Sequence, residues 1–326
     1  MIIICTSISF LTKDHYFGRT LDMECSYDEK VIITPRNYNL KFRMSKSPDK
    51  AYAIIGIGTV VDDYPLYYDA TNEKGLSIAG LNFTGTAIFT GSVNDKNNIG
   101  VFELIPWILR NCSSVDEARD LLTETNIVKM DFNEKYKSAE LHWMVSDRNY
   151  SIVLECVQEG MKIYYNPVHI LTNNPEFPMQ IFNLNNFMSL TREEPETRFA
   201  EGFDLNKYSR GMGAIGLPGD SSSMSRFVRA TFTRLNSVSR ETESASISQF
   251  FHILDTVSQV NGCVRVDENF EKTIYMSCCN TDKGIYYYKT YDNNQLSAVD
   301  LYHENLDRTD LIMYNLINKQ QINYQN

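Results

Sequence analysis

Apolar positions along most of the chain fall in short runs that are rich in β-branched and aromatic residues. Such runs, bounded by turn residues, are typical of β-strands. The predicted strands cover residues 2–10, 31–34, 53–58, 76–83, 141–146, 152–157, 161–165, 169–172, 273–278, 285–290 and 296–301. Polar turns at residues 147–149 and 158–160 join three of these strands, so we expect the central strands to pair antiparallel.

Helices are predicted between the two groups of strands, at residues 102–112, 114–123, 226–237 and 248–260. The first is apolar around much of its circumference, which indicates a buried helix. The second opens with a capping box of Ser114 and Glu117, a pattern typical of helix N-termini. Strands in two blocks and helices in two blocks predict an α+β fold, in which antiparallel sheets are covered by helices in one domain.

Charge and length narrow the class of protein. The 326 residues carry a formal net charge of −10, which argues against a nucleic-acid partner. No stretch approaches the roughly 18 apolar residues of a membrane span. Residues 1–4 are apolar but too few for a signal peptide. We therefore expect a cytoplasmic protein, of bacterial origin, that does not bind membranes.

The cysteines and histidines offer little to a metal or a cofactor. The seven cysteines include no CxxC pair, and an odd number in a long chain indicates reduced thiols rather than a disulfide framework. The five histidines have no metal-ligand spacing, and His142 is interpreted as a hydrogen-bonded core residue. We expect no metal and no organic cofactor.

A GxGxxG match at residues 211–216 is followed by Leu217, Pro218 and Gly219. A dinucleotide-binding loop must open a helix, whereas this sequence favours a turn.

The N-terminal segment carries the most informative chemistry. If residues 3–10 and 16–22 form a hairpin, Cys5 lies opposite residues 20–22, and directly opposed residues are about 4.5–5.5 Å apart. Arg19 and Asp22 can then approach Cys5, and a nearby arginine favours the thiolate. If residues 1–4 are removed, the α-amine of Cys5 can act as the general base. The alternative is a buried strand thiol beside an ordinary ion pair.

The sequence around Cys5 resembles the start of the choloylglycine hydrolases, the family of bile salt hydrolases and penicillin V acylases. The likeness runs nearly the full length. It is carried by YFGR at 16–19 with Asp22, ITPRNY at 33–38, NEKGL at 72–76, AGLNF at 79–83, LHW at 141–143, LTNNP at 171–175, GLPGD at 216–220 and SRF at 225–227. The resemblance implies the four-layer αββα sandwich of N-terminal-nucleophile hydrolases, with antiparallel sheets. The amidase domain would then span residues 5–326, preceded by a short propeptide or extra residues at 1–4.

By resemblance, three residues of the hairpin have catalytic roles. Cys5 matches the nucleophile and, through its freed amine, the base. Arg19 matches the arginine beside the thiol. Asp22 matches the carboxylate that orients the Cys5 amine.

Three further residues match positions around the reacting carbonyl in the family. Asn82 and Asn173 match the asparagines whose N–H groups stabilise an oxyanion. Arg226 matches a second arginine that supports the site. The implied reaction is the hydrolysis of glycine- or taurine-conjugated bile salts through a cysteine thioester, in a homotetramer.

The resemblance to the family also predicts which substrates the chain prefers. Bile salt hydrolases usually carry asparagine at the position of Asn82, where many penicillin V acylases carry tyrosine, so Asn82 favours bile salts. Residues matching the steroid groove are Leu21, Val61, Phe132 and Tyr136. Arg210 lies in a loop signature that accompanies taurine preference, and it could pair with a sulfonate. We expect Arg210→Ala to lower taurocholate turnover more than glycocholate turnover, and equal losses would contradict this.

The chain departs from the family pattern before Cys5, where three isoleucines follow Met1 and most bile salt hydrolases begin Met-Cys. An N→S acyl shift at the bond between Ile4 and Cys5 could expose the amine. Thr20 also replaces the usual asparagine, a change we expect to be mild because threonine keeps a hydroxyl. Two alternatives stay open: a penicillin V acylase, and an unprocessed homologue that binds amphipathic ligands without turnover.

Overall fold

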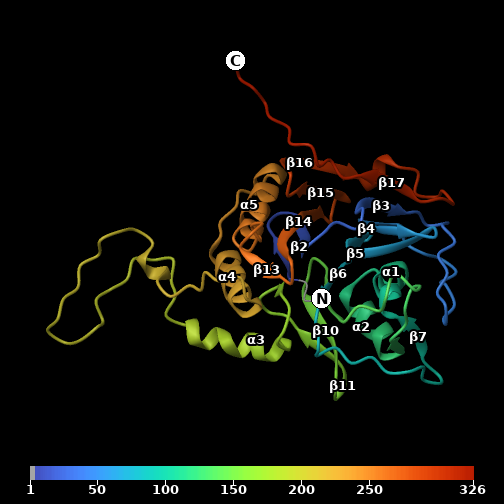
Figure 1. The fold of residues 1–326 in the computed structure, drawn as a ribbon, viewed down its shortest axis with the longest axis horizontal. Coiled ribbons are helices and arrows are strands. Elements are labelled where there is room, and N and C mark those ends of the chain that lie inside the picture. The colour runs from blue at the N-terminus through green and yellow to red at the C-terminus, as the bar shows by residue number, and fades with distance from the viewer. Residues whose placement is uncertain (1–3) are drawn as a thin grey trace.

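The computed structural model describes residues 4–326, which form a four-layer αββα sandwich (Figure 1). Two large antiparallel sheets lie face to face in the described residues, and helices cover the outer face of each. The first sheet has the strand order β12 (Ile170–Leu171), β1 (Ile4–Leu11), β2 (His15–Met23), β14 (Asn269–Asn280), β15 (Ile285–Thr290) and β16 (Asn293–Asp300), with β13 (Val264–Val266) beside β14. The predicted fold class is confirmed.

The second sheet has the order β11 (Gly160–Tyr165), β10 (Ser151–Val157), β9 (Leu141–Ser146), β6 (Ser77–Asn82), β5 (Tyr64–Asn72), β4 (Ile54–Val61), β3 (Lys30–Thr34) and β17 (Ile312–Asn315). A small parallel pair, β7 (Asn97–Gly100) and β8 (Thr125–Val128), lies apart from it. The antiparallel pairing predicted for the turns at residues 147–149 and 158–160 is confirmed in β9, β10 and β11.

The helices divide between the two outer faces. Helices α4 (Ser223–Asn236) and α5 (Glu243–Asp255) pack on the first sheet, and α1 (Leu104–Asn111) packs on the second, with α2 (Val115–Thr123) beside α1. Helix α3 (Phe177–Asn183) contacts α4. Single 3-10 turns are η1 (Val101–Glu103), η2 (Leu184–Phe187), η3 (Met212–Ala214) and η4 (Leu301–His303).

The core therefore has two parts, one between the sheets and under α4 and α5, the other between the second sheet and α1. Every residue of β2 is buried, because the first sheet is covered on both faces. Residues 5–10 of β1 are buried as well, although Thr6, Ser7 and Ser9 are polar.

Several predicted boundaries are wrong. Helix α5 begins at Glu243 and ends at Asp255, about five residues before the predicted range of 248–260. Strand β5 was not predicted, because Pro65 and a polar mixture break its apolar alternation. Residues 2–3 of the first predicted strand lie outside the described residues, and the strand is described from Ile4.

The predicted helix start at Ser114 is confirmed. Its side chain accepts a hydrogen bond from the backbone N–H of Glu117 at 3.2 Å. The Glu117 carboxylate, however, accepts from Ser113 rather than from Ser114.

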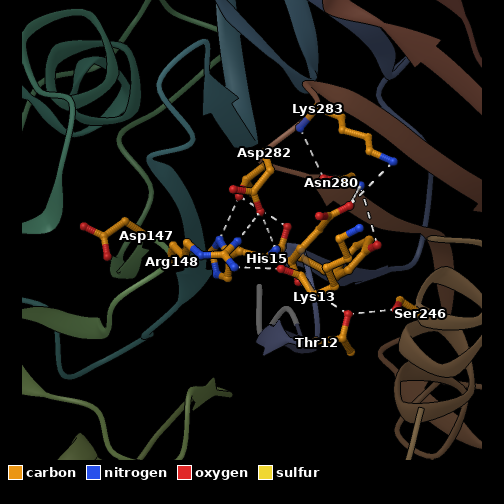
Figure 2. Close-up of polar contacts among 12 residues, drawn as sticks. Thr12, Lys13, His15, Asp147, Arg148, Ser246, Asn280, Asp282 and Lys283 are labelled. Carbon is orange, nitrogen blue, oxygen red and sulfur yellow. Dashed lines mark hydrogen bonds and ion pairs between the residues drawn. The ribbon is translucent and has the colours of Figure 1, made fainter. Parts of the chain in front are cut away.

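The turn of the β1–β2 hairpin is tied to the turns of both sheets (Figure 2). Asp282, after β14, accepts from the backbone N–H of His15 at 2.6 Å and from Arg148 Nη1 at 2.8 Å. Arg148, after β9, also donates to the carbonyl oxygen of Lys13 at 2.7 Å. The hairpin that carries Cys5 is thus anchored at its far end.

A long segment leaves the sandwich between η2 and α4, at residues 188–222, which we call the arm (Figure 1). Its exposed apolar side chains are Met188, Phe199, Phe203, Leu205, Tyr208 and Ile215. The GxGxxG match lies in this arm as the turn η3, flanked by Gly211 and Gly216 with positive φ. The expected turn is confirmed.

Candidate active site

The β1–β2 hairpin determines what lies beside Cys5. Its register pairs Cys5 with Leu21, within the range that the sequence predicts, so Asp22 is adjacent to the partner of the cysteine and Arg19 is two residues before it. Gly18 allows β2 to approach β14 closely, because a Cβ atom there would lie 2.0 Å from the carbonyl oxygen of Ser277. The adjacent N–H of Arg19 donates to Ser277 Oγ at 3.1 Å.

The thiol of Cys5 is buried, with 1% of the residue exposed. Burial raises the pKa of the thiol, while the charges of Arg19 and Arg226 and the N–H of Asp22 act in the opposite direction. The sequence predicts that Arg19 favours the thiolate, but burial outweighs that effect in this chain. The thiol therefore needs a base as well as a nearby cation.

Arg19 is buried between the sheets. Its Nε donates to the carbonyl oxygen of Thr20 at 3.0 Å, and its Nη1 donates to those of Tyr68, at 3.0 Å, and Gly80. Burial alone would lower the pKa of this guanidinium, but electrostatic interaction with nearby acidic groups, first Cys5 and then Tyr275 and Asp69, raises it above its usual value.

Asp69 on β5 is a buried carboxylate that the sequence did not indicate. It accepts hydrogen bonds from Tyr275 OH at 2.7 Å, from Ser277 Oγ at 3.0 Å and from Tyr286 OH. These donors come from the opposite sheet. Burial raises the pKa of Asp69, while Arg19 and the three hydroxyl groups act in the opposite direction.

Arg226, at the start of α4, joins the backbone of Cys5 to Asn173. Its Nη1 donates to the carbonyl oxygen of Cys5 at 2.6 Å and to Thr6 Oγ1 at 2.7 Å, and its Nη2 donates to Asn173 Oδ1 at 2.6 Å. The same Asn173 oxygen accepts the N–H of Cys5 at 2.9 Å. A closed ring of hydrogen bonds thus fixes the nitrogen and the carbonyl oxygen of Cys5.

Asp22 lies next to this ring but is held by hydroxyl groups. Thr20 Oγ1 donates to it at 2.9 Å and Thr273 Oγ1 at 2.6 Å. Burial raises the pKa of Asp22 to about 6, although Arg226 and the two threonines favour its ionised form. The hydroxyl group of Thr20, which replaces the asparagine usual in the family, therefore binds Asp22. The hydrogen-bond partner of the Cys5 nitrogen is Asn173.

Asn82 and Asn173 meet in front of Cys5. The side-chain amide of Asn173 donates to the carbonyl oxygen of Asn82 at 2.9 Å, and Asn82 Oδ1 accepts from Thr84 Oγ1 at 2.8 Å. The backbone N–H of Asn173 donates to Ser223 Oγ at 2.9 Å. Helix α4 thereby positions both Arg226 and the segment that carries Asn173.

Comparison with known proteins gives the family. Residues 5–314 match the family model described as linear amide C–N hydrolases, choloylglycine hydrolase family. The chain is 55% identical, over 98% of both sequences, to the bile salt hydrolase/transferase of Lactiplantibacillus plantarum. It is 38% identical to that of Clostridium perfringens, over 99% of this chain and 100% of the relative. This chain belongs to the choloylglycine hydrolase family.

Solved structures agree with this membership. A variant of conjugated bile acid hydrolase from Clostridium perfringens superposes with a TM-score of 0.91 at 38% identity, covering 99% of this chain and 100% of the other. Penicillin V acylase from Agrobacterium tumefaciens shares the fold, with a TM-score of 0.74 at 18% identity, over 95% and 91% of the two chains. The predicted resemblance is confirmed, and the chain is an amidase of the choloylglycine hydrolase family.

The residues predicted to line a groove lie in two places. Leu21 is buried opposite Cys5. Val61 pairs with Tyr64 at the β4–β5 turn, and the Tyr64 ring lies 5.6 Å from that of Phe132. The N–H of Phe132 donates to the carbonyl oxygen of Tyr136 at 2.9 Å. Val61, Phe132 and Tyr136 therefore lie in neighbouring segments of this choloylglycine hydrolase family member.

Arg210 lies elsewhere, at an exposed position on the arm. Among residues 4–326, its side chain makes no hydrogen bond or ion pair with Cys5, Asn82 or Asn173. The structure does not bring Arg210 together with the other predicted site residues.

His142 has a structural role, as predicted. It is fully buried between the carboxylate of Glu155, at 3.0 Å, and the carbonyl oxygen of Thr172, at 2.9 Å, and it stacks on Phe83. Within residues 4–326, no group of three or more His, Cys, Asp or Glu side chains is arranged to hold a metal ion. Over the same residues, no helix has the length and apolar character needed to cross a membrane.

Proposed function

We propose that this chain hydrolyses the amide bond of glycine- or taurine-conjugated bile salts, with Cys5 as the nucleophile once residues 1–4 have been removed. The observation that carries the proposal is the hydrogen-bond ring of Arg226, Asn173 and the Cys5 backbone. An α-amine created at Cys5 would be held at Asn173 Oδ1, beside its own thiol. The family match, which begins at Cys5, and the names of the relatives support the same reading.

The reaction follows from these positions. The amine of Cys5 takes the thiol proton, and the sulfur attacks the amide carbonyl carbon. Side-chain amide N–H groups of Asn82 and Asn173 stabilise the oxyanion. The amine returns its proton to the leaving nitrogen as the C–N bond breaks, which releases glycine or taurine and leaves a thioester. Water, deprotonated by the same amine, then releases the bile acid.

Intact-protein mass spectrometry combined with activity assays tests this proposal. We expect purified protein to lack residues 1–4 and to hydrolyse taurocholate and glycocholate, whereas Cys5→Ala should retain residues 1–4 and lose at least 1,000-fold in kcat (order of magnitude). Retention of residues 1–4 on all of the protein, with no amidase activity, would favour a homologue that only binds amphipathic ligands. Faster hydrolysis of penicillin V than of taurocholate, measured side by side, would favour a penicillin V acylase.

We further propose that residues 5–326 form a homotetramer in the bacterial cytoplasm. The apolar side chains exposed on the arm support association, because contiguous apolar surface commonly marks an interface. All seven cysteines are free, which is consistent with a reducing compartment. Size-exclusion chromatography with light scattering and fractionation of the source cells test the two statements separately.

A further inference from the structure

Glu271 on β14 is a buried carboxyl group next to the bond that precedes Cys5. Only 1% of the residue is exposed. Its Oε1 accepts the backbone N–H of Ile4 at 2.6 Å, whereas its Oε2 is buried without a hydrogen-bond partner among residues 4–326. Burial raises the pKa of Glu271 to about 8, and the negative charges of Asp22 and Glu24 act in the same direction. A buried acceptor left unpaired is costly, so this arrangement needs an explanation.

The missing partner is a cation with N–H groups. Arg226, the positive charge that lowers the pKa of Glu271, already uses its Nη atoms for Cys5, Thr6 and Asn173. Cleavage of the bond between Ile4 and Cys5 would supply a new cation, because it creates an α-ammonium with three N–H donors. That group arises one residue from the present partner of Glu271, and adjacent Cα atoms are about 3.8 Å apart.

We propose that Glu271 is a positioning residue that receives the α-amine of Cys5 after cleavage and holds it in the site. The inference rests on the proposed removal of residues 1–4. Asn173 Oδ1 binds the nitrogen of Cys5 from one side, and Glu271 takes the N–H groups that cleavage creates. Glu271 Oε2, which is unpaired before cleavage, thus accepts a hydrogen bond from the ammonium group that cleavage creates.

The chemistry balances without a further reactant. Water adds its hydroxyl group to the carbonyl carbon of Ile4, and the C–N bond to Cys5 breaks, so that the nitrogen leaves as an amine. The Ile4 acid loses its proton to solvent, and the proton of the Glu271 carboxyl group passes to the amine. An ammonium–carboxylate pair then replaces a single hydrogen bond to a peptide N–H.

A stability cycle tests the inference without using the thiol. Four proteins are made in a Cys5→Ala background: the full chain and a chain lacking residues 2–4, each with and without Glu271→Gln. In the shortened chain, methionine aminopeptidase exposes the amine of position 5, and intact mass confirms each N-terminus. We expect Glu271→Gln to lower Tm by roughly 2–4 °C more in the shortened chain than in the full chain.

The pH dependence separates a charge partner from a packing residue. The difference between the two chains should disappear above about pH 10, where the amine is neutral. Glu24→Gln removes a nearby charge that does not accept the N–H of Ile4, and it should affect both chains alike. Equal Tm changes for Glu271→Gln in both chains, or a difference that persists unchanged above pH 10, would overturn the inference. Glu271→Asp, which keeps the charge, should retain part of the difference, and its loss would count against the inference as well.

A second measurement uses the active enzyme. In the chain lacking residues 2–4 but retaining Cys5, loss of the Glu271 carboxylate should lower the pKa of the amine. The acid limb of kcat/KM for taurocholate should therefore move down by about one pH unit in Glu271→Gln. A lower kcat with an unmoved limb would indicate a structural role and overturn the inference. Because the proteins of the stability cycle lack the Cys5 thiol, its result does not depend on whether Cys5 is the nucleophile.

Discussion

At the scale of single residues, the geometry of the site depends on the guanidinium group of Arg226. The side chain is fully buried, and burial lowers its pKa to about 10, so it stays charged at neutral pH. Its terminal nitrogens donate to oxygens of Cys5, Thr6 and Asn173, each within 2.7 Å. A rigid guanidinium can satisfy such a set in one orientation, whereas the single ammonium of a lysine cannot.

We therefore expect Arg226→Lys to lower kcat for bile salt hydrolysis by roughly 100-fold, because the carbonyl and the nitrogen of Cys5 lose their common anchor. Steady-state kinetics with taurocholate measures the effect. Arg229→Lys is a matched control on the same helix, since its guanidinium bonds the carbonyl oxygens of Pro218, Asp220 and Thr256 outside the site. A loss of the same size in both variants would show that a disturbance of helix α4, rather than the loss of the guanidinium contacts of Arg226, lowers kcat.

The residue scale also shows what sequence reasoning can reach. Cys5, Arg19 and Asp22 could be brought together by local hairpin geometry alone. Asn173 and Arg226 were predicted only from the resemblance to the family, because their contacts with Cys5 join residues far apart in the sequence. Glu271 had no signal at all, since it contacts Ile4 across 267 residues. The effect of burial on the Cys5 thiol was missed for the same reason, because desolvation is a property of the packed sandwich.

At the scale of elements, the β1–β2 hairpin is fixed at its turn by Asp282 (Figure 2). This carboxylate pairs the backbone N–H of His15, a residue that is 1% exposed, with the guanidinium of Arg148. Loss of Asp282 leaves a backbone donor without its partner, whereas loss of Arg148 removes a half-exposed ion pair. The two effects should differ, because an unpaired buried donor costs more than a surface ion pair contributes.

We expect Asp282→Ala to lower the free energy of unfolding by about 1–3 kcal/mol, and Arg148→Ala by less than about 1 kcal/mol. Urea titration followed by circular dichroism measures both. The value of kcat should be unchanged in Asp282→Ala below the unfolding transition, because Cys5 lies at the other end of β1. Equal destabilisation by the two substitutions would mean that the ion pair, not the hydrogen bond of the backbone, anchors the turn.

The bounds of strands and helices were predicted correctly where the apolar residues of the sequence coincide with the buried ones. Strands β9 and β15 have the predicted bounds, since apolar runs and turns define both ends. Helix α5 was placed too late, because its first turn is polar and its start has no side-chain cap. Strand β5 was missed because its alternation of half-buried tyrosines around Pro65 does not stand out from a loop.

At the scale of the whole molecule, the two sheets are joined by a buried chain of hydroxyl groups and histidines. Ser9 Oγ lies 2.8 Å from His15 Nε2 and accepts from Ser146 Oγ at 2.9 Å. Ser151 Oγ donates to Ser146 Oγ and lies 2.9 Å from His169 Nδ1. Burial lowers the pKa of His15 to about 3 and that of His169 to about 4. Both rings are therefore neutral in the folded protein at neutral pH.

The burial of these neutral histidines makes the stability of the fold sensitive to acid. Below an ordinary histidine pKa of about 6.5, the unfolded chain binds a proton at position 15 that the folded chain excludes down to about pH 3. Stability contributed by neutral His15 is thus present above pH 6.5 and lost as the pH falls. We expect His15→Asn to reduce the slope of unfolding free energy against pH in this window by about 1.4 kcal/mol per pH unit. His252→Asn, at an exposed site on α5, should leave the slope unchanged, and an unchanged slope in His15→Asn would refute the argument.

The arm is the part of the molecule that the sandwich does not explain. Residues 188–222 form a long connection with little secondary structure of its own, and such loops in compact domains are commonly functional. Met188, Phe199 and Tyr208 are each at least 76% exposed, although burial of an aromatic side chain is favourable by about 1.5–3 kcal/mol. In the homotetramer that we propose, a second copy of the chain would cover these side chains.

We therefore expect the double variant Phe199→Ser, Tyr208→Ser to shift the species seen by light scattering from four times the mass of one chain toward one. The control is Leu235→Ser with Val238→Ser, which removes exposed apolar side chains at the end of α4 and should leave the mass unchanged. If the arm variant keeps the mass of the wild type, the arm is not the interface. Because the arm leaves the body between η2 and α4, dissociation alone should not disturb the Arg226 ring, and kcat per chain measured on the dissociated protein tests that separation.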